Sequence, residues 1–261
     1  MITWTSPSPS ETCLKAGLRF GDKGTHTSRT MMLSELESLL GSVPAGATRE
    51  DYSFAIVEDN VLGKQTEATR RLTNQRLGEL YGLDPSVPIF RVLRRVWDVE
   101  REGRPLIALI CALARDPLLR STVQSVLSLH PGAELVRAGF LDSLRSAVGD
   151  RLNDSTLDKV ARNAASTWSQ SGHLEGRVRK IRQHVTPTAG PLALALWLGS
   201  TEGLAGEQLL RSRWALVLDR SPRELEPIVL RAKQLGLVTA SIGGGTIEID
   251  ASKLNAVQLG S

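Results

Sequence analysis

Cationic side chains are concentrated in one stretch of the sequence, residues 160–185. This stretch contains five Lys or Arg residues and one acid, Glu175. Its excess of positive charge equals the formal net charge of the whole 261-residue chain, +4, so the rest of the sequence is close to neutral. Clustered guanidinium and ammonium groups are typical of surfaces that bind polyanions. The five cations are Arg162, Arg177, Arg179, Lys180 and Arg182.

A second segment with side chains suited to nucleic acid is residues 60–82, NVLGKQTEATRRLTNQRLGELYG. Two short helices, joined by a turn that contains Gly63 and followed by the capping residue Thr66, are the outline of a helix-turn-helix. The apolar spacing predicts that the second helix buries Ala68 and Leu77 and exposes Thr73. Any helical hairpin with one polar face satisfies the same outline. The side chains that could reach phosphates and base edges are Gln65, Thr69, Arg70, Asn74 and Arg76.

No pattern in the sequence indicates an active site, a cofactor or a metal. Phosphate-binding glycine motifs, zinc-protease motifs, nucleophile elbows and CxxC pairs are all missing from the sequence. Asp116 invites a catalytic interpretation, but an ion pair with Arg115 at a helix end before a proline accounts for it more simply. The four histidines are scattered, with a surface or capping role expected for His173 and His184. Two isolated cysteines, Cys13 and Cys111, argue against a disulfide scaffold and a structural zinc site.

The cationic stretch must be positioned by a helix followed by a β-hairpin. Ser155 is a plausible N-cap, and apolar residues from Leu157 to Trp168 recur at helical spacing. Gly172 can end the helix in a left-handed conformation. From Leu174 onward apolar and cationic residues alternate, which predicts a basic wing. A solvated basic hairpin without any partner is the alternative interpretation.

The same order of helix, glycine and hairpin returns near the end of the sequence. Ser221 and Pro222 begin a helix that Gly236 ends, and residues 238–242 and 246–250 alternate around three glycines. This order suggests a second winged-helix-like module. Its hairpin carries Glu248 and Asp250 and no cation, so we expect the C-terminal module to be structural or protein-binding.

These patterns together predict a mainly α protein, a helical bundle with helix-turn-helix and winged-helix-like modules and two small β-hairpins. The expected divisions are a flexible N-terminal tail and loop (1–24), a helical domain with the basic wing (25–187) and the C-terminal module (188–261). The longest apolar runs, 105–114 and 191–198, are too short to cross a bilayer and are expected to be buried helices. The N-terminus has no signal-peptide pattern, so a cytoplasmic location is expected.

Residues 25–187 resemble the BrxA family, small accessory proteins of BREX phage-defence systems. The resemblance rests on IVEDNVLGKQTEATRRLTNQRL, on the helices around residues 90–119 and on ARNAASTWSQSGHLEGRVRKIRQHVTP; the segment after Pro187 is outside it. It implies a mainly helical, non-enzymatic protein that binds double-stranded DNA and works beside a methyltransferase and an ATPase. The DNA-facing positions that it implies are Lys64, Arg70, Arg71, Arg177, Arg179 and Arg182.

The leading hypothesis is therefore a non-enzymatic, double-stranded DNA-binding protein without a cofactor. One alternative is a scaffold that docks a larger defence-complex subunit through its apolar helices and acidic C-terminal hairpin. Another is an enzyme with an unrecognised site, for which a lone carboxylate such as Asp116 is the first candidate.

Overall fold

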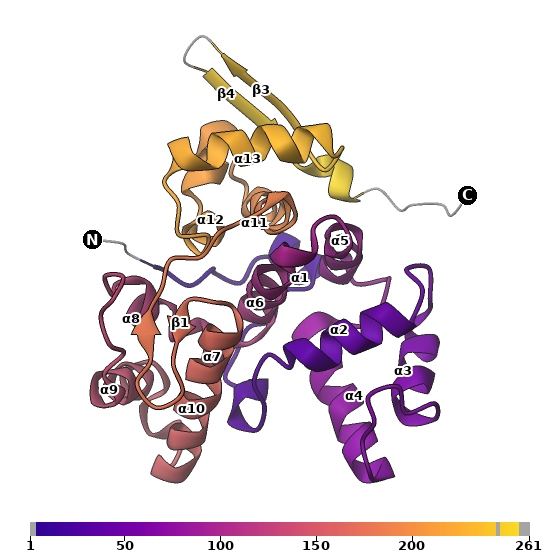
Figure 1. Ribbon diagram of the computed structural model, residues 1–261, viewed down its shortest axis with the longest axis vertical. Coiled ribbons are helices and arrows are strands. Elements are labelled where there is room, and N and C mark those ends of the chain that lie inside the picture. The colour runs from indigo at the N-terminus through magenta and orange to yellow at the C-terminus, as the bar shows by residue number, and fades with distance from the viewer. Residues whose placement is uncertain (1–3, 244–245, 256–261) are drawn as a thin grey trace.

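The computed structural model describes residues 4–243 and 246–255 and confirms a mainly α protein with two small antiparallel hairpins. Figure 1 shows helices of the N-terminal third on one side of the lower body, helices α8–α10 on the other, and the C-terminal segment above both. No helix in the described ranges is long and apolar enough to span a membrane.

The first part of the chain forms short helices around one long polar one. The bounds are α1 (Glu11–Ala16), the 3-10 turn η1 (Thr25–Thr27), α2 (Leu33–Ser42), α3 (Arg49–Val57) and α4 (Glu67–Tyr81). Thr48 and Asp51 form a capping box at the start of α3, and Thr66 caps α4 as expected. The residues expected to be a flexible tail instead contain α1, and Trp4 packs edge-to-face on Trp214 with ring centroids 5.9 Å apart.

Two apolar helices make the centre of the core. Helix α5 (Pro88–Trp97) and the turn η2 (Arg101–Gly103) lead into α6 (Arg104–Arg115), in which residues 106–114 are all buried. Helix α11 (Ala189–Thr201) is buried from residue 189 to 199 and packs on α5, α6, α12 and α13. A helix that is apolar on all sides must be covered on all sides. One continuous core therefore joins the N-terminal body to the C-terminal segment.

The middle of the chain carries the first hairpin. Helices α7 (Pro117–Arg120), α8 (Val123–Leu127), α9 (Arg137–Val148) and the turn η3 (Gly149–Arg151) lead to α10 (Asp154–Gln170). Helix α10 is capped by Asn153, whose side chain accepts from the Thr156 N–H, and not by Ser155. Gly172 has the predicted positive φ, +86°. Strands β1 (Leu174–Glu175) and β2 (Ile181–Arg182) follow; residues 174–182 are called the basic hairpin.

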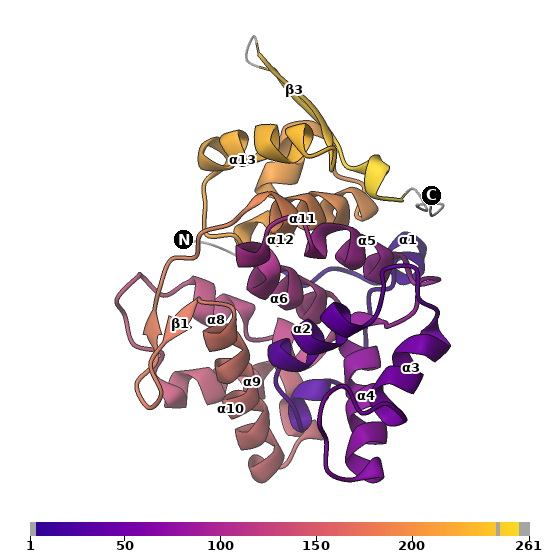
Figure 2. The same cartoon turned by 45° about the vertical axis from the view of Figure 1, so that its right-hand side comes forward.

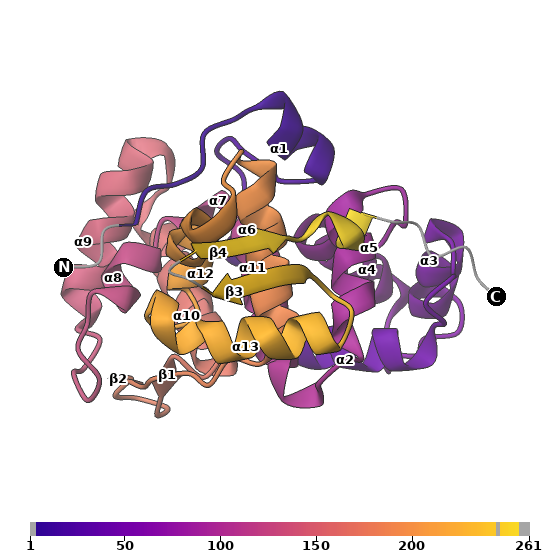
Figure 3. The same cartoon turned by 90° about the horizontal axis from the view of Figure 1, so that it is seen from above.

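The C-terminal segment has the order of a winged helix. After α11 come η4 (Gly206–Arg211), α12 (Arg213–Leu216), α13 (Pro222–Gln234), β3 (Thr239–Gly243), β4 (Thr246–Asp250) and η5 (Ser252–Asn255). Ser221 forms a capping box with Glu224, and Pro222 opens α13 as predicted. Strands β3 and β4 run alongside α13 (Figure 3) and project beyond the helices (Figure 2). The glycines at 244 and 245 are outside the described residues.

Candidate nucleic-acid interface

The basic hairpin is held on two edges of β2. On one edge Leu174 pairs with Arg182 and Glu175 with Ile181. On the other edge, backbone hydrogen bonds of 2.8 Å join Gly132 to Arg182 and Leu135 to Lys180. The hairpin is therefore anchored to the loop before α9 as well as to its own first strand.

The tip of the basic hairpin is exposed and cationic. Val178 is 92% exposed, and Arg177 beside it forms no hydrogen bond or ion pair within the described residues. Arg179 is exposed and pairs with Glu134, with Nη2 2.8 Å from the carboxylate. Such exposed pairs are weak and exchange readily. Both guanidinium groups can therefore reach an external anion.

Lys180 and Arg162 are less available than the sequence suggested. The Lys180 ammonium donates to Ser169 Oγ at 2.7 Å and to the Gly176 carbonyl at 3.2 Å. Partial burial lowers the pKa of Lys180. Arg162 is exposed on α10, where its Nε lies 3.3 Å from the carboxylate of Asp158. Both side chains are engaged within the protein.

Arg182 does not face a ligand, which contradicts its predicted role. Only 2% of the residue is exposed, because it lies directly opposite the buried Leu174 on the inner face of the hairpin. Its guanidinium donates to the Val126 carbonyl at 3.2 Å and forms an ion pair with Asp219. Asp219 lies in the turn between α12 and α13. Arg182 therefore fastens the basic hairpin to the C-terminal segment.

His173 completes this hairpin junction, which consists of His173, Arg182, Val217 and Asp219. It is fully buried, contrary to the surface role expected for it. Its Nε2 lies 2.9 Å from the Val217 carbonyl, which can only accept, so Nε2 carries the proton and Nδ1 accepts from the Ser171 hydroxyl. Burial lowers the pKa of His173 to about 4, although the nearby Asp219 opposes the shift.

We expect the stability of the protein to fall as the pH drops from about 6.5 to about 4. In this window the unfolded chain binds a proton at His173 that the folded protein excludes. The free energy of unfolding should decrease by about 3 kcal/mol. Urea denaturation at pH 7 and pH 4.5 measures the change, and His173→Gln should flatten it. An identical pH dependence for the wild type and His173→Gln would contradict the assignment.

The helix-turn-helix predicted around Gly63 differs from the structure in two respects. The segment between the two helices is longer than expected, and α4 buries a different face. Residues 58–66 separate α3 from α4, whereas a helix-turn-helix uses a turn of about three or four residues. Thr73, expected to be exposed, is 1% exposed, and Ala68, expected to be buried, is exposed. The buried face is rotated because α4 packs against both α3 and α6.

Most candidate side chains near α4 already have partners inside the protein. Lys64 lies 2.9 Å from Glu35, Arg71 pairs with Glu67, and Thr69 shares a hydrogen bond with Thr66. The Asn74 amide donates to Ser53 at 2.9 Å, and Arg70 points to the Glu58 carbonyl at 3.5 Å. Gln65 is exposed. The structure does not bring this set together with the tip of the basic hairpin.

The C-terminal segment, which the sequence predicts to be a winged-helix-like module with a structural or protein-binding role, does contain a helix, turn and helix in succession. Helices α12 and α13 are joined by residues 217–221, and the hairpin β3–β4 follows. Arg223 and Lys233 on α13 are exposed, and Leu230 is 43% exposed. The Ser221 and Pro222 start signal marks the second helix in the sequence. The short α12 has no comparable signal.

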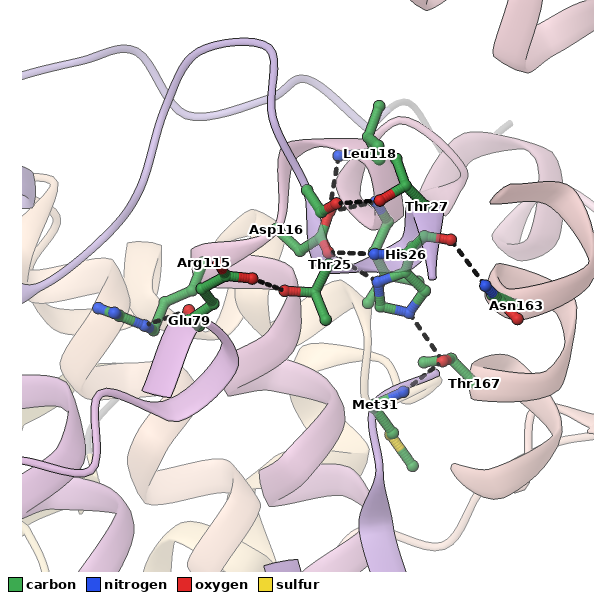
Figure 4. Close-up of polar contacts among 12 residues, drawn as sticks. Thr25, His26, Thr27, Met31, Glu79, Arg115, Asp116, Leu118, Asn163 and Thr167 are labelled. Atoms are coloured by element: carbon green, nitrogen blue, oxygen red, sulfur yellow. Dashed lines mark hydrogen bonds and ion pairs between the residues drawn. The ribbon is translucent and has the colours of Figure 1, made fainter. Parts of the chain in front are cut away.

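Asp116 belongs to a buried structural network and is not open to a substrate (Figure 4). Its Oδ2 accepts from the His26 N–H at 3.0 Å and lies 2.8 Å from His26 Nδ1. Its Oδ1 caps α7 through Leu118 and Leu119. His26 Nε2 lies 2.8 Å from Thr167 Oγ1. The hydrogen-bond partner of Asp116 is thus His26 and not the neighbouring Arg115, and the resulting Asp–His–Thr chain is buried inside the protein.

Metal binding finds no support in the described part of the chain, where no three His, Cys, Asp or Glu side chains form a group that could hold an ion. Cys13 and Cys111 are both buried and free. The sequence matches no protein-family model, and no curated protein matches it significantly.

Proposed function

We propose that this protein is a non-enzymatic, double-stranded DNA-binding accessory protein of a bacterial anti-phage defence system of the BREX type. The observation that carries the proposal is the exposed tip of the basic hairpin. There Arg177 and Arg179 project around Val178, while the base of the hairpin is fixed by the buried Arg182–Asp219 pair. The resemblance to the BrxA family adds the defence context.

An exposed cationic tip on an anchored base suits the DNA backbone because guanidinium groups bind phosphate oxygens in bidentate geometry. The hairpin junction also brings the base of the hairpin to the start of α13, where His184 lies 3.8 Å from Asp219 and is 58% exposed. Arg223 is exposed in the first turn of α13. Duplex DNA that contacts the hairpin tip could therefore also meet the N-terminal end of α13. Phosphate contacts of this kind position a duplex without reading its sequence.

Removing both exposed arginines of the tip is expected to weaken duplex binding. In Arg177→Ala/Arg179→Ala the fold should be unchanged, because neither side chain is buried. Fluorescence anisotropy with a labelled duplex of mixed sequence measures the loss. The matched control is Arg101→Ala/Arg211→Ala, which removes the same charge from exposed positions elsewhere. If the two double variants bind the duplex with equal affinity, the hairpin tip is not part of the DNA interface.

A scaffold role is the second candidate, and the β3–β4 hairpin favours it. This hairpin projects from the helical body (Figure 2) and exposes Glu248 and Asp250. Within the described residues β3 pairs only with β4, while β4 also packs against η4, so the outer edge of β3 is the one available for an added strand. A protein that shows no mobility shift with any duplex at low salt in size-exclusion chromatography would favour this candidate.

A further inference from the structure

A pocket of about 340 Å³, lined mostly by polar residues, lies between the start of α3, the C-terminal half of α4, the segment after α1 and the C-terminal end of α6. Its charged lining consists of Arg19, Arg49, Arg115 and Glu79. Asn74 and Gln75 of α4 add amide groups to the same wall. Three cations against one carboxylate leave an excess of two positive charges in one concave site.

Two of these guanidinium groups are held side by side. Arg19 Nη1 and Arg115 Nε both donate to the backbone carbonyl of Glu79, at 3.2 and 3.0 Å. Arg115 also donates to the Gly78 carbonyl at 3.3 Å (the Arg115–Glu79 contact is drawn in Figure 4). Burial, together with the positive charge of the nearby Arg19, lowers the pKa of Arg115 to about 10. The fold thus holds the two positively charged guanidinium groups of Arg19 and Arg115 close together where they are partly shielded from water.

The carboxylate in the cavity does not balance these arginines. Glu79 accepts from Thr25 at 2.9 Å, from Gln75 at 3.0 Å and from Arg76 at 2.8 Å. Burial alone would raise the pKa of Glu79, but these hydrogen bonds lower it, so the carboxylate stays ionised with its oxygens occupied. Within the described residues Arg19 and Arg115 donate only to backbone carbonyls. Their charges remain available to an external anion.

Arg49 adds a third cation from another direction. It is exposed in the first turn of α3, where the helix dipole is positive and a cation is unfavourable by itself. The carboxylates near it are Glu50 and Asp51 in the same turn, of which Asp51 is engaged in the capping box, and Asp84, whose pKa is lowered first by hydrogen bonds with Ser86 and only in part by Arg49. Asp84 does not line the cavity. Arg49 therefore reinforces the positive potential made by Arg19 and Arg115.

We propose that this cavity binds a phosphate monoester, through Arg19, Arg49 and Arg115, with Asn74 and Gln75 as further hydrogen-bond donors. A phosphate monoester carries about −1.5 to −2 charge at neutral pH, which matches the excess of positive charge. Two of its oxygens can accept the two parallel N–H groups of a guanidinium. The phosphate could belong to a free nucleotide or to the 5′ end of a DNA strand. This proposal does not depend on whether the basic hairpin binds duplex DNA.

The test is isothermal titration calorimetry with AMP at low salt, with adenosine as the ligand that lacks the phosphate. We expect AMP to bind with a Kd below about 1 mM, inorganic phosphate to compete, and adenosine not to bind. Arg49→Ala should weaken AMP binding about tenfold, because it removes one charge-assisted contact. Arg101→Ala removes an exposed arginine that does not line the cavity and should bind AMP like the wild type.

A second variant blocks the cavity without removing charge. Gly78 lines the cavity inside α4, and a Cβ added there meets no atom within 4 Å. Gly78→Leu should therefore fold, since Leu is a better helix former than Gly, and should abolish AMP binding. A wild type that does not bind AMP or phosphate, or variants that bind as the wild type does, would overturn the proposal.

The source of the phosphate is decided by a pair of duplexes that differ only in a 5′-phosphate or a 5′-hydroxyl. Preference for the phosphorylated duplex, lost in Gly78→Leu, assigns the site to DNA ends. No preference, with AMP binding retained, assigns it to a free nucleotide. Because AMP binding does not involve the hairpin tip, Arg177→Ala/Arg179→Ala should leave it unchanged, which separates this site from the proposed duplex interface.

Discussion

Replacing Arg182 with Met is expected to destabilise the protein by about 3–5 kcal/mol, because the change leaves the buried carboxylate of Asp219 without its partner. The side chains of Arg182 and Asp219 are 2% and 4% exposed. The variant also removes the donor to the Val126 carbonyl, which is buried with it. Urea denaturation followed by circular dichroism measures the loss.

The double variant Arg182→Met/Asp219→Asn separates the ion pair from the packing around it. Asn is chosen because residue 219 has φ +57°, a conformation that Asn tolerates. Removing both charges should restore part of the stability lost in the single variant. Arg179→Met breaks the exposed pair with Glu134 and is the control, with little expected change. A single Arg182 variant as stable as this control would contradict the anchoring role.

Replacing Asp116 with Ala is expected to cost at least about 3 kcal/mol of stability. Its carboxylate accepts four hydrogen bonds, two from His26 and two from the first backbone N–H groups of α7. All of these donors are buried and would lose their acceptor together. Thermal and urea unfolding of the purified variant measure the effect.

The pKa of Asp116 sets the pH range of this stabilisation. Burial would raise it, but the charge and hydrogen bonds of His26 and the α7 N–H groups outweigh burial and lower it. The stabilising effect is therefore present above the unfolded pKa of about 4 and is lost as the pH falls below it. Asp51→Ala, which removes the exposed carboxylate of the α3 capping box, is the control. Equal stability of the Asp116 and Asp51 variants at pH 7 would contradict a structural role for the buried network.

The sequence predicts those features of the fold that depend on neighbours along the chain. The capping residues Thr66 and Ser221, the helix end at Gly172 and both hairpins follow from local rules and are confirmed. The mainly α class follows from the same periodicities. These patterns hold because each depends on the backbone of a few adjacent residues, although the N-cap of α10 is Asn153 and not the predicted Ser155.

The candidate site is predicted less well because burial of a charge depends on distant residues. Arg182 has the same local pattern as Arg177 and Arg179, but its acceptor Asp219 lies 37 positions along the chain. Asp116 is separated by 90 positions from His26. Likewise, the apolar spacing of α4 does not reveal that it packs on two helices at once, which buries Thr73. The sequence shows where the cationic residues are, but not which of them are buried in ion pairs and hydrogen bonds inside the protein.

The salt dependence of duplex binding tests the central claim most directly. Each phosphate neutralised by a cation contributes a slope of about −0.9 to the plot of log K against log salt concentration. The wild type should bind duplex DNA with a steep negative slope, and Arg177→Ala/Arg179→Ala should flatten it by about 2 units. The Arg101→Ala/Arg211→Ala control should keep the wild-type slope. Absence of duplex binding by the wild type at low salt, or an unchanged slope in the tip variant, would contradict the proposed function of the basic hairpin.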